Sequence, residues 1–280
     1  MRDPEKCLPV IKERLSDLYD IASAVQQRQL DFRDDDHFGW MIFLFFAKQT
    51  EHTRGILTLA EKGLYRDAGL IARSMMEGIV QLDWASKDPQ ARALAWKEFM
   101  WVSSWRKMMN DEEASLPLPA DERARIEAEV RNRGEQFLTR EGRQRHKNGQ
   151  PLRKNHYFEN WTGQKLRPLF EDVGLRKVYL LAYSELSIWH HWNQEIMAEA
   201  IHIDHERGRI SYLEPSPRAG ALALANALQA LFQTLEHVDA HFKLNVGKKL
   251  NEVKKELKKG LALFDGTETN GPDSTAPGKR

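Results

Sequence analysis

Apolar residues recur every three or four positions along most of the chain, which is the spacing of one-sided α-helices. The first such stretch runs from Leu8 to Gln29. A second begins after the acidic run Asp34 to Asp36, which suits a helix N-cap and first turn, and it continues to about Lys62. Gly63 then suits the C′ position that follows a helix. The pattern predicts two long helices at the start of the chain.

A third helix is predicted from Tyr65 to Ser86, and between Ala68 and Leu82 its only charged residues are Arg73 and Glu77. A helix that is apolar on nearly all sides is expected at the centre of a fold. Apolar spacing and helix-breaking residues predict further helices downstream. One begins at Pro89, and the others span Asp121 to Phe137, Gly163 to Gly174, Leu175 to Ala200 and Arg218 to Val246. A basic amphipathic extension follows from Lys248 to Leu263.

Three stretches lack the helical pattern. Glycine and asparagine accumulate from Thr139 to Asn160, which predicts a long surface loop. Residues His202 to Glu214 are expected to form a minimal hairpin that turns at Gly208. Residues 265–280 are rich in Gly, Thr, Pro and Ser and are expected to be disordered. The sequence therefore predicts an all-α protein with one multi-helix bundle domain over residues 1–264, a long basic loop and a disordered tail.

Charge and cysteine content narrow the class of protein. The 280 residues include 42 basic and 41 acidic residues, so the formal net charge is +1 and any nucleic-acid surface must be a local patch. Cys7 is the single cysteine and cannot form an internal disulfide. The start of the chain lacks the apolar segment of a signal peptide, and the apolar run from Phe38 to Ala47 is about half of the roughly 20 residues that cross a bilayer. We expect a cytoplasmic protein without membrane contact.

Arg73 and Glu77 stand about one helical turn apart, so their side chains lie on one face and can touch. Burying an ion pair usually adds no stability over apolar residues, because each ion loses its hydration. Two interpretations remain open. The pair is either a structural bridge to a polar partner elsewhere, or a site in which Arg73 binds an anion that Glu77 positions.

A second polar cluster lies late in the predicted helix from Leu175 to Ala200. By helical spacing its polar face consists of Tyr183, Ser187, His190 and Gln194. His191 lies about 100° away from that face, so at most one of the two histidines points fully inward. A histidine there can act as a general acid or base, or can simply satisfy hydrogen bonds in the core.

The predicted loop is locally basic and is flanked by aromatic residues. Its candidate nucleic-acid-binding residues are Arg140, Arg143, Arg145, Lys147, Arg153 and Lys154. Positive charge beside aromatic rings is typical of single-stranded nucleic-acid binding. The alternative is a solvated, flexible loop without a ligand.

Motifs for cofactors and metals are missing from the sequence. There is no P-loop, no dinucleotide-binding glycine motif, no nucleophile elbow and no Cys-x-x-Cys. His237 and His241 stand about one turn apart, but two ligands do not complete a zinc site. We therefore expect no cofactor and no metal.

Two segments carry a resemblance to a known family. One is Gly63 to Glu77, which contains Arg73-Ser74-x-x-Glu77, and the other is Tyr183 to His190, which contains Ser187-x-x-His190. They resemble a bacterial all-helical family of unknown function, and that family is similar to the HEPN group of helical proteins. Many HEPN proteins are RNases or nucleotide-binding partners in toxin and phage-defence systems. The resemblance implies that Arg73, Glu77 and His190 share one pocket between helices as catalytic residues.

The sequence departs from the HEPN pattern in one respect. HEPN nucleases carry a histidine a few residues after an arginine on the same helix, and no histidine follows Arg73 at that spacing. Arg140 and His146 fit the interval, but both lie in the predicted loop. Catalysis would therefore have to join Arg73 to His190 or His191 across two helices.

Three functions remain as hypotheses. The first is an HEPN-like protein that binds RNA or a nucleotide phosphate. In its fuller form this hypothesis includes RNA cleavage, as an RNase of a toxin or phage-defence system. The alternative is a non-enzymatic helical scaffold or adaptor whose Arg73–Glu77–His190 cluster is structural. The third is a sensor of small anions that uses the same pocket. We expect a homo-oligomer, namely a dimer, with RNA or a nucleotide as the other partner.

Overall fold

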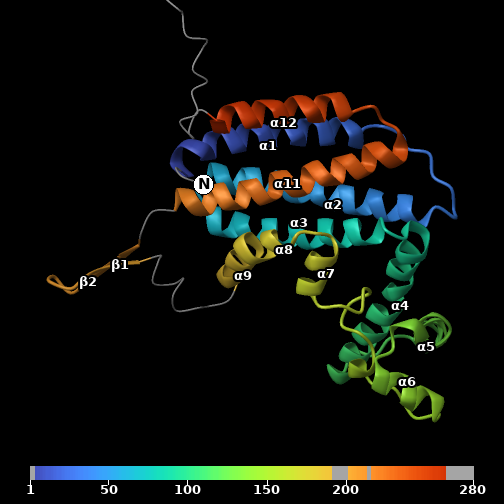
Figure 1. The fold of residues 1–280 in the computed structure, drawn as a ribbon. Helices are drawn as coiled ribbons and strands as arrows, with labels where there is room; N and C mark the ends of the chain where they lie inside the picture. The colour runs from blue at the N-terminus through green and yellow to red at the C-terminus, as the bar shows by residue number, and fades with distance from the viewer. Residues whose placement is uncertain (1–3, 191–200, 213–215, 263–280) are drawn as a thin grey trace, which may run out of the picture. The chain divides into compact units, whose positions relative to one another are not determined.

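The computed structural model describes residues 4–190, 201–212 and 216–262. Within these residues the chain is all-α apart from one two-stranded sheet, which confirms the predicted fold class (Figure 1). No helix in these ranges combines the length and the apolar character that a bilayer crossing requires. The chain forms two compact units, the first from residues 1–29, 47–76 and 182–280 and the second from residues 30–46 and 77–181.

Two helices belong partly to each unit. They are α2 (His37–Glu61) and α3 (Tyr65–Ala85). The Asp36 Oδ1 atom accepts a hydrogen bond of 2.9 Å from the Gly39 N–H, which confirms the predicted N-cap of α2. Gly63 closes α2 with φ +72° in the left-handed region, where an L side chain would be strained, so its C′ assignment is confirmed too.

In the first unit, α1 (Pro4–Gln26) packs against both α11 (Pro217–Phe242) and α12 (Gly247–Ala262) (Figure 1). The helix α1 buries one stripe, which includes Ile11, Leu15 and Leu18. Leu250 and Val253 of α12 are buried as well, so the apolar face of the predicted basic extension is used for packing. The unit also contains α9 (Ser184–His190) and the hairpin of β1 (Ile201–Asp204) and β2 (Arg209–Tyr212).

The hairpin confirms the strand prediction. The strands β1 and β2 are antiparallel, and Ile203 lies opposite Ile210. Gly208 lies in the turn with φ +59°. This is the left-handed conformation that short hairpin turns require and that glycine adopts without strain.

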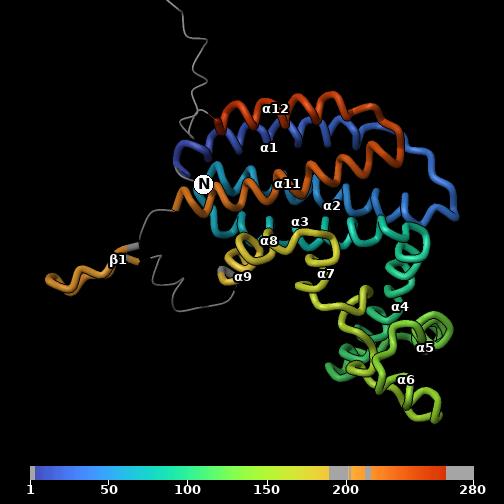
Figure 2. Tube along the Cα trace, viewed as in Figure 1, coloured from blue at the N-terminus to red at the C-terminus, as the bar shows by residue number. Residues whose placement is uncertain are grey.

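In the second unit, α4 (Pro89–Glu113) packs against α5 (Ala120–Arg133), and α6 (Arg140–Lys147) follows α5 in the same unit (Figure 2). Aromatic pairs fill the space between these elements. The ring centroids of Phe99 and Phe137 are 5.1 Å apart, and those of Trp105 and Tyr157 are 5.4 Å apart. Each pair joins α4 to a segment that follows α5, so α4 organises the unit.

The segment from Thr139 to Asn160 is not the structureless loop that the sequence predicts. It contains the helix α6 (Arg140–Lys147) and a 3-10 turn (Lys154–His156). The helix is polar on most sides, so it lacks the apolar spacing that reveals a helix in sequence. Its signals are an N-cap at Thr139, an acidic residue in the first turn and three basic residues in the last turn.

Other boundaries differ by a turn or less, and one helix is interrupted. The helix α5 ends at Arg133 and is followed by a 3-10 turn (Glu135–Phe137), whereas the sequence predicts one continuous helix. The predicted break at Gly174 is confirmed, since α7 (Leu166–Asp172) ends before it and α8 (Arg176–Val178) begins after it. The helix that follows is interrupted by a π-helical turn (Tyr179–Tyr183) between α8 and α9. The predicted helical residues 191–200 and the predicted disordered tail lie outside the described residues.

Candidate functional site

Arg73 contacts the first member of the predicted polar face. Its Nε atom donates a hydrogen bond of 3.1 Å to the Tyr183 hydroxyl, and its Cζ atom lies 5.2 Å from the centroid of the Tyr183 ring. Tyr183 is buried and ends the π-helical turn. Turns of this kind are frequent at functional sites. The structure therefore joins α3 to the π-helical turn that leads into α9.

Arg73 and Glu77 are half-buried rather than buried, which corrects the premise that this is an ion pair sealed in an apolar helix. The free-energy cost of desolvating these two charges is therefore smaller than for a fully buried ion pair. His190 is the last residue of α9, and its side chain lies outside the described part of the structure, as do His191 and Gln194. The assignment of Arg73, Glu77 and His190 to one pocket stays a prediction.

The helix α6 is anchored at its N-terminus. The Thr139 Oγ1 atom accepts a hydrogen bond of 3.1 Å from the Gly142 N–H, and the Thr139 backbone N–H donates a bond of 2.8 Å to the His156 carbonyl oxygen. A Cβ atom at Gly142 would lie 2.2 Å from that same oxygen. Only glycine allows so close an approach, so α6 is held against the segment around His156.

His156 completes the anchor from the other side. Its side chain is buried, and its Nδ1 atom accepts a hydrogen bond of 2.8 Å from the Arg153 backbone N–H. Because Nδ1 accepts, the ring proton of the neutral form resides on Nε2, which lies 3.5 Å from the Glu141 Oε1 atom. His156 is therefore occupied in fixing α6 and the 3-10 turn.

Three cations of α6 share its outward face, and we call Arg140, Arg143 and Lys147 the α6 cationic face. At about 100° per residue they lie within about 60° of one another, whereas Gly142 points toward the protein. All three side chains are exposed. Within the described residues none of the three forms an ion pair or a side-chain hydrogen bond. The face is a compact positive surface without an internal counter-ion.

The other predicted nucleic-acid-binding residues are placed differently. The Arg145 Nε atom donates a hydrogen bond of 3.2 Å to the Pro151 carbonyl oxygen. The Lys154 Nζ atom lies 2.6 Å from the Asn110 Oδ1 atom and 2.8 Å from the Glu113 carboxylate. Arg153 is exposed. The structure thus uses Arg145 and Lys154 in internal contacts.

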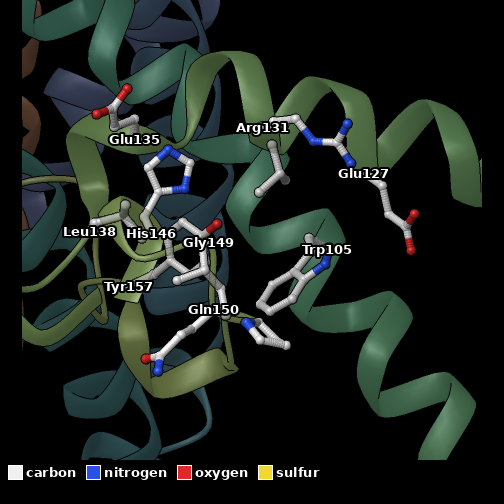
Figure 3. Close-up of a pocket in the computed structure, with 12 residues that line it drawn as sticks. Trp105, Glu127, Arg131, Glu135, Leu138, His146, Gly149, Gln150 and Tyr157 are labelled. Atoms are coloured by element: carbon white, nitrogen blue, oxygen red, sulfur yellow. The ribbon is translucent and has the colours of Figure 1, made fainter. Parts of the chain in front are cut away.

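A pocket of about 450 Å³ opens next to α6. Figure 3 shows Trp105 reaching into it from α4, while Glu127 and Arg131 extend from α5 and His146 from α6. Tyr157 forms part of the wall, and burial raises the pKa of its hydroxyl, which stays protonated at neutral pH. The pocket combines aromatic surface, both signs of charge and an exposed histidine.

Arg106 fixes the segment that carries Tyr157. One of its terminal nitrogens, Nη2, donates hydrogen bonds to the carbonyl oxygens of Lys154, Tyr157 and Phe158 at 3.2, 3.0 and 2.8 Å. Its other terminal nitrogen lies 3.4 Å from the Glu159 carbonyl oxygen. Burial lowers the pKa of the guanidinium from its usual value, but arginine stays charged in proteins. Arg106 therefore acts as a main-chain clamp.

Sequence reasoning missed the pocket and this clamp. The pairing of Trp105 with Tyr157 depends on contacts between distant parts of the chain that no local pattern encodes. Arg106 had a usable signal, because it stands about one turn after the buried Val102 and two turns after Phe99. A charge at the edge of an apolar stripe indicates a polar partner inside the fold.

Arg140 and His146 both lie on α6, so the predicted loop no longer argues against helical geometry between them. Six residues along a helix place their side chains about 120° apart, so the two do not share a face. His146 lines the pocket, whereas Arg140 belongs to the α6 cationic face. In the described ranges, no group of three or more His, Cys, Asp or Glu side chains is arranged to hold a metal ion.

Comparison with known proteins gives one match. The model of a family of unknown function, DUF5677, matches residues 39–209, which is more than half of the chain. The matched region contains Arg73, Glu77, His190, the α6 cationic face and the pocket. Searches of curated proteins and of solved structures found no match.

Proposed function

The chain belongs to the family of unknown function DUF5677, and from this premise we propose that it binds single-stranded RNA through the α6 cationic face and the adjoining pocket. The observation that carries the proposal is the placement of three exposed cations on one side of a short helix next to an aromatic-walled pocket, with no ion pair to any of the three among the described residues. Cations attract the phosphates of a strand, and aromatic rings stack on its bases.

The charge balance of the chain supports a localised site. The net charge is only +1, so the whole molecule does not attract polyanions, and a strand would be drawn to the exposed cations of one surface. The preference for RNA over DNA rests on the resemblance to the HEPN group. Single-stranded RNA is favoured over a duplex because unstacked bases can enter a pocket.

The binding experiment uses a fluorescent single-stranded RNA of mixed sequence and measures anisotropy over a series of salt concentrations. The test variant combines Arg140→Gln, Arg143→Gln and Lys147→Gln. We expect it to bind at least about tenfold more weakly at low salt. The slope of log K against log salt should become shallower by about 2, since each phosphate contact with a single strand contributes about 0.7.

A matched control removes the same charge from the first unit. Lys248→Gln, Lys255→Gln and Lys258→Gln change three exposed lysines of α12 and should leave RNA affinity within about twofold. Unchanged binding by the α6 variant, or loss of binding only in the α12 variant, would refute the proposed site. An RNA without bases that binds as tightly as the intact strand would remove the pocket from the proposal.

Cleavage of bound RNA is a second candidate function, and it rests on the other cluster. The hydrogen bond between Arg73 and Tyr183 supports it, because it brings the arginine of the Arg73-Ser74-x-x-Glu77 segment to the helix turn that leads into α9. In this HEPN-like role Arg73 would hold a phosphate, Glu77 would orient it and His190 would transfer a proton. A toxin or phage-defence RNase is the biological form that the resemblance implies.

The competing function is a helical scaffold or adaptor. In that role the contact between Arg73 and Tyr183 serves stability alone, and the exposed lysines of α12 contact the partner. The RNA experiment separates the two functions, because an adaptor has no salt-dependent affinity for RNA at α6.

A further inference from the structure

The exposed residues of α2 form one outward stripe. Between residues 40 and 58 they are Trp40, Leu44, Lys48, Glu51, Arg54 and Thr58, and they follow one another at intervals of three or four residues. This spacing places them on a single side of the helix. The last four are polar or charged, as expected for a face in water. The first two are apolar, with 41 % of Trp40 and 45 % of Leu44 exposed.

Trp40 is fixed in place by the segment that precedes α2. Phe32 stacks on its ring with centroids 5.1 Å apart and 28° between the planes, and the edge of Phe32 also meets Phe43 at 5.4 Å. A ring held in this way loses little side-chain entropy when a partner covers it. Exposed apolar surface that includes a tryptophan is typical of protein interfaces. Trp40 and Leu44 together are called the Trp40–Leu44 face.

We propose that the Trp40–Leu44 face is the contact between two copies of this chain. The two α2 helices pack antiparallel about a twofold axis that passes between residues 40 and 44. Trp40 then covers the partner's Leu44, and Leu44 covers the partner's Trp40. A twofold interface must be self-complementary in this reciprocal way, and two apolar residues one turn apart satisfy the condition.

Charge complementarity favours a second copy of the chain as the partner and an antiparallel arrangement of the two α2 helices. Lys48 lies about one turn beyond Leu44, and Asp36 lies about one turn before Trp40. In the antiparallel register each Lys48 faces the partner's Asp36, where the acidic run of residues 34–36 begins the helix. A parallel arrangement would instead set lysine against lysine and aspartate against aspartate, which costs several kcal/mol. Opposite charges therefore border the apolar contact on both sides.

The contact is small, so we expect dimerisation to depend on protein concentration. Sedimentation velocity of the full chain over a range of concentrations measures it. Leu44→Glu and Trp40→Lys each place a charge against an apolar residue, and each should weaken the dimer at least about tenfold. Thr58→Glu adds the same charge outside the apolar part of the stripe and should leave the dimer unchanged.

A mixture of the two variants tests the register. When Leu44→Glu and Trp40→Lys chains pair, one contact joins the introduced glutamate to the introduced lysine and the other is the native Trp40–Leu44 contact. We expect differently tagged variants to form a mixed dimer although neither dimerises well alone. Circular dichroism confirms that each variant is folded.

The proposal is overturned if the wild-type chain is monomeric at every concentration, or if its dimer tolerates Leu44→Glu. A mixture that stays monomeric overturns the antiparallel register. These outcomes do not depend on RNA, so this inference and the proposed function can fail separately.

Discussion

At the scale of single residues, Arg106 and Arg73 make two different kinds of polar contact. Arg106 donates to several main-chain carbonyls and fixes a chain segment, so its role follows from its bonds. Arg73 donates a hydrogen bond of 3.1 Å to the Tyr183 phenol, which holds α3 to the π-helical turn before α9. A guanidinium carries five N–H donors in a planar fork, so this side chain can serve a ligand as well as a bridge.

The contact between Arg73 and Tyr183 predicts a graded loss of stability. Tyr183→Phe removes one part-buried hydrogen bond and should lower the free energy of unfolding by about 1 kcal/mol. Arg73→Ala also removes the cation–π contact and should lower it by about 1–3 kcal/mol. Urea unfolding measures both changes. RNA affinity of the folded Tyr183→Phe variant should stay unchanged, because the α6 cationic face belongs to the second unit.

The same variants test cleavage. If Arg73 and His190 act on RNA, incubation with total RNA should give products with the wild type and with Tyr183→Phe, and none with Arg73→Ala or His190→Ala. Cleavage that survives both of the last two substitutions would refute this mechanism. A stable Arg73→Ala protein would instead refute the structural bridge.

At the scale of elements, α6 depends on a backbone contact that a single methyl group would break. Gly142→Ala places a Cβ atom 2.2 Å from the His156 carbonyl oxygen, and a main-chain atom held by Thr139 cannot move aside easily. We expect α6 to detach, the free energy of unfolding to fall by about 1–3 kcal/mol and RNA affinity to fall with it. Hydrogen exchange of the α6 amides and RNA anisotropy measure the two effects.

Gly55→Ala on α2 is the matched control for that change. The Cβ atom it adds would lie 3.6 Å from the Ile71 Cδ1 atom, which is an ordinary contact. Alanine in a helix interior is favoured over glycine by about 0.5–1 kcal/mol, so this variant should be slightly more stable. Normal protection of α6 in Gly142→Ala would show that the close approach does not anchor the helix.

The same comparison explains which elements the sequence predicts. The long helices α2, α3 and α11 bury apolar stripes, so the spacing of their residues reveals them. The helix α6 buries only Gly142, and its stability comes from a cap and from contacts with a segment more than ten residues away. The spacing of apolar residues does not reveal such contacts, and for this reason the sequence predicts a loop in this segment.

At the scale of the whole molecule, the sequence again predicts those parts of the site that depend on local pattern and misses those that depend on contacts between distant segments. The basic residues around Arg140 could be proposed from residue type and spacing, whereas the link between Arg73 and the polar face was implied by the family resemblance alone. The pocket could not be predicted from the sequence, because its walls come from α4, α5, α6 and Tyr157, which are separated along the chain. Nor does spacing tell which cations remain available, since Arg145 and Lys154 are engaged by atoms that are distant in sequence or belong to the main chain.

The predicted single domain can be tested through the two compact units. The helices α2 and α3 run through both units, so unfolding either unit would cut two helices of the other, and we expect one cooperative transition. Most tryptophans fall in the sequence ranges of the second unit, namely Trp40, Trp84, Trp96, Trp101, Trp105 and Trp161. Tryptophan fluorescence therefore follows mainly that unit, whereas far-ultraviolet circular dichroism follows the helices of both. In guanidinium titrations the two signals should coincide at one midpoint. Separate midpoints would show two domains that unfold independently and would contradict the single-domain prediction.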